Sequence, residues 1–245
     1  MCFSQPISLV LSVIGIILSI YLRIRYRKDK DIWRLVYPSD YFTAMEILQF
    51  FQYYWVNDCN SQVNIYLTWI GYLHISFQPL FSNILASYDT QRRRPFYSKL
   101  ILPMCIISGT FMFTRFLWTS PFPCDTNLDP LCGARTCTFD GTVHFKWQLV
   151  LRAPNYFTPG AFIHAFMMFV PPLLIGSKIA TLVLLITGPV LGYYLSRNKD
   201  EWASIWCFYS IFQVILGTFA TLYLKHRREK RIAKSKQEDN SKKEN

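Results

Sequence analysis

Seven long apolar runs, separated by short charged or polar segments, dominate the pattern of hydrophobic and polar positions along this chain. About 20 apolar residues in a helix span the hydrocarbon core of a bilayer. We therefore predict an all-α, polytopic bundle of seven transmembrane helices within residues 1–224, followed by a basic tail at 225–245. The predicted spans are residues 7–22, 42–56, 63–87, 100–118, 157–175, 179–195 and 202–224, with a long loop at 119–156.

Positive charge lies mainly on one side of the predicted bundle. The net charge of +11 would point to nucleic acid in a soluble protein, but here the charges border apolar runs. Of the 26 Lys and Arg residues, 20 fall in the first, third and fifth connections and the tail, whereas 5 fall on the opposite side. Because cytosolic segments retain Lys and Arg, we predict a lumenal N-terminus and a cytosolic C-terminus. The expected partners are membrane lipids, with no nucleic acid.

Four cysteines fall in segments assigned to the lumenal side, and none falls in a cytosolic connection. In an oxidising compartment these four predict two disulfides. Four cysteines allow three pairings, and the sequence leaves the choice open. A bond from Cys59 to the long loop is preferred, because it would tie that loop over the bundle; the alternative is that all four are free. The four candidates are Cys59, Cys124, Cys132 and Cys137.

The chain ends with Lys242 and Lys243 at the fourth and third positions from its C-terminus. This arrangement resembles the dilysine retrieval signal of endoplasmic reticulum membrane proteins. The resemblance implies a multi-pass protein of the endoplasmic reticulum membrane and recognition of the tail by coat proteins. The tail lacks apolar periodicity, so we predict that residues 225–245 are disordered or form a frayed helical extension of the last span.

Polar residues inside the spans form the candidate site. Ionisable groups within a bilayer are costly and often functional. In the third span Asn64, Gly71 and Gln78 recur every seven residues and mark one polar face. This face either holds helices together or lines a cavity, and we expect Glu46 to face it at the depth of His74. The candidate cavity-lining residues are Glu46, Gln49, Asn64, His74, Gln78 and His164.

The long loop offers no metal site. Its Asp125-Thr-Asn-Leu-Asp129 segment begins like a calcium loop, but Pro130 stands where Gly is needed and Thr136 where Glu is needed. We therefore predict no metal and no cofactor. His144 and Trp147 are expected at the membrane interface, where aromatic side chains gather.

The chain lacks the motifs of several known seven-span families: the last span has no Schiff-base lysine, and H-x-x-H-H is absent. Residues 45–49 (MEILQ) and 72–79 (YLHISFQP) resemble a family of uncharacterised seven-span transmembrane proteins found in eukaryotes and some large viruses. The resemblance covers most of the chain and implies the same seven-span fold. It carries no established activity.

Three functions are compatible with these features. The leading hypothesis is a non-enzymatic protein that binds a lipid or a small apolar ligand within the bundle. A lipid-modifying enzyme would use Glu46 with His74 or His164 as acid and base, and would need the two within hydrogen-bond reach. A transporter or channel would place Glu46 in a pathway open to each side. Catalytic residues and the oligomeric state stay unknown at this stage.

Overall fold

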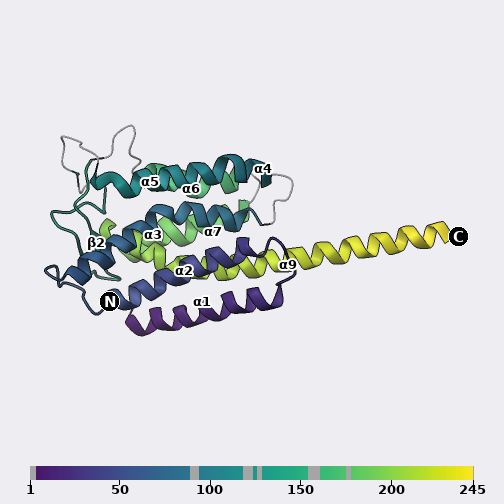
Figure 1. Cartoon of the computed structure of the whole chain (residues 1–245), viewed down its shortest axis with the longest axis horizontal. Helices are drawn as coiled ribbons and strands as arrows, with labels where there is room; N and C mark the ends of the chain where they lie inside the picture. The colour runs from purple at the N-terminus through teal and green to yellow at the C-terminus, as the bar shows by residue number, and fades with distance from the viewer. Residues whose placement is uncertain are drawn as a thin grey trace.

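A computed structural model describes residues 4–88, 94–117, 124–125, 129–153, 161–174 and 178–244. These residues form a mostly helical bundle with one small sheet at one end (Figure 1). The α-helices are α1 (Gln5–Arg25), α2 (Trp33–Gln52), α3 (Gln62–Ala86), α4 (Arg94–Phe96), α5 (Leu102–Phe113), α6 (Ala161–Leu174), α7 (Lys178–Leu185), α8 (Leu191–Leu195) and α9 (Trp202–Glu244). The π-helices η2 (Tyr97–Ile101) and η4 (Ile186–Val190) and the 3-10 helices η3 (Thr114–Phe116) and η5 (Lys199–Glu201) join or precede them.

A helical segment overlaps the described part of each predicted span, but the bounds differ, most clearly at the second. The apolar run suggested residues 42–56, whereas α2 begins at Trp33 and ends at Gln52. The early turns of α2 bury Leu35 and Val36 but expose neighbouring positions, an amphipathic pattern that a search for continuous apolar runs misses. The helix is followed by turns that lead to Asn57, which has a φ of 67°.

Three helical stretches among the described residues are long and apolar enough to cross a membrane. They are Gln5–Arg25, Ser98–Phe116 and Lys199–Arg227, while Phe162–Leu174 and Thr181–Leu195 are apolar but shorter. Helices α2 and α3 lie outside this set. Length and composition thus support a helical bundle with three candidate spans, which is a coarser result than the predicted seven.

Helix α1 packs on α2 through a face of small residues. Ser8, Ser12, Gly15 and Ser19 are buried on this face. A Cβ on Gly15 would lie 2.1 Å from the Thr43 hydroxyl oxygen, so only glycine allows this approach. Small residues let membrane helices approach closely. The opposite face of α1 exposes branched apolar side chains such as Ile17, which suits contact with lipid.

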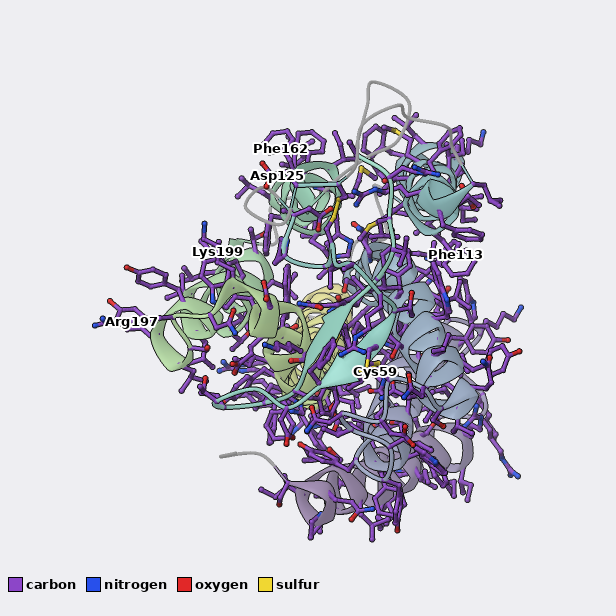
Figure 2. The ribbon with its side chains drawn as sticks, turned by 90° about the vertical axis from the view of Figure 1, so that its left-hand side faces the viewer. Cys59, Phe113, Asp125, Phe162, Arg197 and Lys199 are labelled. Carbon is purple, nitrogen blue, oxygen red and sulfur yellow. A yellow bond between two sulfur atoms is a disulfide. The ribbon has the colours of Figure 1, made fainter. Side chains whose placement is uncertain are left out.

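The 119–156 loop contains a hairpin that the sequence analysis missed, so the fold is not purely α. Strand β1 (Cys137–Phe139) pairs antiparallel with β2 (Lys146–Gln148). Figure 2, which looks onto this end, shows the hairpin lying across the bundle in front of α9. The turn contains Asp140-Gly141, a common hairpin signal between strand-forming residues.

Two disulfides lie at this end of the described structure. Cys59 bonds to Cys137 of β1, and Cys124 bonds to Cys132. The preferred pairing of Cys59 with the long loop is therefore confirmed. It fastens the hairpin to the connection between α2 and α3.

Helix α9 runs through the bundle and continues to Glu244, projecting well beyond the other helices (Figure 1). This is the second of the two predicted states of the tail, a helical extension of the last span. The reason is local: no Gly or Pro follows Gly217, and Lys, Arg, Glu and Gln are good helix formers.

Candidate functional site

A row of polar side chains on α2 points into the bundle. Glu46, Gln49 and Gln52 are spaced by three residues, so they share one face of the helix. Their exposed fractions are 0%, 0% and 1%. We call these three residues the α2 polar row.

Most polar atoms of the α2 polar row make no hydrogen bond to the described protein groups. They are both carboxyl oxygens of Glu46, the Oε1 and Nε2 atoms of Gln49, and the Oε1 atom of Gln52. The Nε2 atom of Gln52 donates to the Leu67 carbonyl oxygen at 3.1 Å. A buried polar group without a partner costs about 1–3 kcal/mol, and more when it is charged. Native proteins rarely tolerate such atoms without a reason, such as a bound ligand or water.

Side chains from four parts of the chain surround the α2 polar row. Ser8 of α1 lies beside the Glu46 carboxyl, and Tyr53 and Cys207 are within electrostatic range of it. The Tyr53 hydroxyl lies 3.2 Å from the Nδ1 atom of His144, which belongs to the hairpin turn. The hairpin therefore covers the end of the row that is nearest the disulfides.

The Glu201 carboxylate holds the backbone of the turn that carries His144. Glu201 accepts hydrogen bonds from the backbone N–H groups of Thr142 and Val143 at 2.8 and 2.9 Å. The N–H of His144 donates to the same carboxylate at 3.2 Å. Burial lowers the pKa of His144 to about 3, although the charge of Glu201 acts in the opposite direction. The imidazole is therefore neutral near pH 7.

The expected interface position of His144 and Trp147 is wrong. Their exposed fractions are 0% and 1%, because both side chains pack from the hairpin against the rest of the bundle. Trp147 also approaches Gly71 of α3, where a Cβ would lie 3.5 Å from the indole ring. Both side chains thus belong to the closed end of the bundle.

The polar face of α3 serves mainly to hold neighbouring elements. The Asn64 Oδ1 atom accepts from the N–H of Thr138 in β1 at 2.8 Å. The Gln78 Nε2 atom donates to the Ser210 hydroxyl of α9 at 2.8 Å. For Asn64 and Gln78 these bonds favour the packing interpretation over the cavity interpretation.

The two histidines inside the predicted spans make no hydrogen bond to Glu46 in the described structure. The His74 ring stacks on Tyr41 of α2 with centroids 3.9 Å apart. The His164 ring meets Trp206 of α9 edge-on at 6.0 Å. Neither bonds to Glu46, whose carboxyl oxygens have no protein partner in the described structure. Close approach of Glu46 to His74 or Gln78 stays a prediction.

Cys124, Asp129 and Cys132 bring potential metal-ligand atoms within 4.8 Å of one another. The two cysteines are joined in a disulfide. Asp129 pairs with the buried Arg115 guanidinium at 2.5 Å. A disulfide and an arginine beside the carboxylate suit a structural cluster better than a cation site. Lys242 and Lys243 fall near the end of α9, and their side chains lie outside the described part of the chain.

The fold and the site define a helical bundle protein with three candidate membrane spans and a covered polar interior. The chain belongs to a family of unknown function, DUF5765, which it matches over residues 6–227. It is similar to the uncharacterized protein R287 of Acanthamoeba polyphaga mimivirus, at 26% identity over 235 residues that cover 88% of this chain and 93% of the relative. No solved structure matches significantly. The resemblance to an uncharacterised family represented in large viruses is confirmed.

Proposed function

We propose that this protein is a multi-pass membrane protein of the endoplasmic reticulum that binds a lipid or a small, largely apolar ligand inside its bundle. The observation that carries the proposal is the α2 polar row, with five buried polar atoms that no described protein group satisfies. Ligand sites of this kind combine apolar walls with a few convergent polar groups.

The surroundings of the row suit an amphipathic ligand. Met45, Tyr72, Phe145, Trp147 and Cys207 form one apolar cluster at this end of the bundle. Such walls would receive the apolar part of a ligand. Glu46 and Gln49 offer both acceptors and donors, so they would bind a hydroxyl, amide or amine group on it.

Two chemically different ends support the proposed orientation with seven crossings. The N-terminal end of α1 and the disulfide-bonded hairpin lie at one end of the bundle, and the extended part of α9 leaves from the other (Figure 1). Disulfides favour an oxidising lumen, and Lys and Arg favour the cytosol. The terminal Lys242 and Lys243 would then face the cytosol, where a retrieval signal is read.

Binding is preferred over catalysis because no direct hydrogen bond joins Glu46 to either histidine in the described structure. A Glu46–histidine mechanism needs the two groups about 2.6–3.2 Å apart, directly or through one water. The His74 ring stacks on the Tyr41 ring, and the His164 ring packs edge-on against Trp206. The lipid-modifying enzyme therefore stays the alternative to the binding protein.

The ligand is tested by purifying the full-length protein in mild detergent and identifying co-purified small molecules by native mass spectrometry. We expect a lipophilic compound at about one per protein. Glu46→Gln keeps the shape of the side chain but changes its hydrogen bonding, and should raise the dissociation constant about tenfold, equivalent to about 1.4 kcal/mol, so that the occupancy falls below that of the parent. Asp58→Asn, the same change at an exposed position, should leave the occupancy unchanged. A parent protein without any bound compound, or equal occupancy in Glu46→Gln, would refute the proposal.

A further inference from the structure

A pocket lies at the opposite end of the bundle from the hairpin. Its volume is about 740 Å³. Seven consecutive residues at the end of α1 and in the following turn line it, together with Lys225 of α9. The lining residues are Ile24, Arg25, Tyr26, Arg27, Lys28, Asp29, Lys30 and Lys225.

Contacts from α9 and from Tyr88, just after α3, hold the wall of this pocket in place. The Asp29 carboxylate accepts from the Lys225 ammonium group at 2.5 Å and from the Tyr88 hydroxyl at 2.5 Å. It also accepts from the N–H of Asp31 at 3.0 Å. Burial acts to raise the pKa of Asp29, but these hydrogen bonds outweigh it and lower the pKa below its ordinary value. The acid of the pocket therefore stays ionised, with its charge already compensated.

The remaining cations of the pocket have no acidic ion-pair partner among the described residues. Arg27, Lys28 and Lys30 are exposed, and none of them forms an ion pair with a described residue. The Arg25 guanidinium lies 5.6 Å from the centre of the Tyr26 ring. Several positive charges therefore line the pocket in addition to the one that neutralises Asp29.

The position of the pocket favours a membrane lipid as its ligand. Helix α1 is one of the candidate membrane spans and ends at Arg25. Ile24, on the rim of the pocket, is 70% exposed, which suits contact with acyl chains. The cations that follow it would then lie at the level of lipid headgroups, where basic clusters attract anionic lipids.

We propose that this pocket binds the phosphomonoester headgroup of an anionic membrane lipid, such as a phosphorylated phosphatidylinositol. A phosphomonoester carries about −1.5 to −2 charges near pH 7, whereas the phosphodiester of an ordinary phospholipid carries one. Arginine and lysine around one hollow match such a concentrated charge. A diffuse basic surface would instead attract anionic lipids according to charge alone.

The test uses the full-length protein in detergent, titrated with fluorescent phosphatidylinositol 4-phosphate and, separately, with fluorescent phosphatidylserine. The pocket variant is Arg27→Ala with Lys28→Ala. The matched control, Lys230→Ala with Arg231→Ala, removes the same two side chains from an exposed part of α9. Because these positions are exposed, both variants should fold normally, which size-exclusion chromatography checks.

We expect the pocket variant to bind phosphatidylinositol 4-phosphate at least about tenfold more weakly, since each cation near an anionic surface contributes roughly a factor of five. The control should change binding less than about twofold, and the parent should prefer this lipid over phosphatidylserine. Equal losses in the two variants, or no preference between the lipids, would overturn the proposal. So would equally tight binding of free inositol 1,4-bisphosphate, which would make the site one for a soluble phosphate.

Discussion

Gly141 and Glu201 depend on each other in the turn that carries His144. A Cβ on Gly141 would lie 1.9 Å from the His144 carbonyl oxygen and 2.6 Å from the Glu201 carboxyl carbon. The carboxylate occupies this space because it accepts the N–H groups of the turn. Because Gly141 has no side chain, the buried Glu201 carboxylate can reach its hydrogen-bond donors in the turn.

We expect Gly141→Ala to destabilise the protein by about 2–4 kcal/mol, because the new methyl group must displace either the carboxylate or the turn. The measurement is the thermal unfolding midpoint in detergent, which should fall. Gly217→Ala is the matched control: its Cβ would lie 3.5 Å from Leu85, an ordinary contact, and alanine favours a helix. Equal midpoints for Gly141→Ala and the parent would show that the turn relaxes easily.

At the residue scale, the sequence indicated Glu46 and Gln49 because polar groups stand out within an apolar run. It did not indicate Gln52, Tyr53 or Glu201. The importance of these residues comes from the hairpin, whose position depends on contacts between distant parts of the chain. The seven-residue spacing on α3 correctly marked a buried face, but the spacing could not tell that Asn64 binds β1 rather than lining a cavity.

At the element scale, the apolar runs in the sequence predicted the helices, but they did not predict the hairpin. An apolar run of sufficient length has few structures open to it in a membrane. The strands β1 and β2 are only three residues long, so their alternation is a weak pattern. The Asp140-Gly141 pair was the available sequence signal for the turn between them.

Helix α9 determines where a tail signal would be presented. At 1.5 Å per residue, the helix extends about 30 Å beyond Lys225. This places Lys242 and Lys243 clear of the bundle. A receptor could then reach them without approaching the lipid surface.

We predict that Lys242→Ser with Lys243→Ser moves the protein from the endoplasmic reticulum toward later secretory compartments, because the terminal dilysine would no longer be recognised. Microscopy of the full-length protein measures the change. Lys234→Ser with Lys236→Ser removes the same charge at other positions and should leave the location unchanged. If the terminal double variant stays in place like the parent, the two lysines are only part of a solvated end.

At the scale of the whole molecule, the bundle has one end closed by disulfides and another bearing basic residues. The sequence predicted this division from charge and cysteine positions. The sequence predicted seven crossings, whereas three helical stretches among the described residues are long and apolar enough to cross a membrane. Helices α2 and α3 fall outside this set, and both bury polar side chains against the rest of the protein.

We predict that a tag after Asn245 is accessible to antibody when only the plasma membrane is permeabilised, and that a tag before Met1 becomes accessible only after all membranes are opened. The reason is the excess of Lys and Arg in the segments that share a side with the tail. Immunofluorescence with selective detergent measures both tags. The reverse pattern, or access to both tags at once, would exclude the proposed orientation.

The bond between Glu201 and Thr142 joins residues that are 59 positions apart, and this has a consequence for biosynthesis. The hairpin turn leaves the ribosome well before η5 and α9 exist. The turn therefore lacks its contact with Glu201 until the last helix has been made, and before then the hairpin depends on the Cys59–Cys137 bond and its contacts with α3. The cover over the α2 polar row is completed late in assembly, so a ligand of the proposed kind can enter the nascent protein even if the finished bundle offers it no entrance.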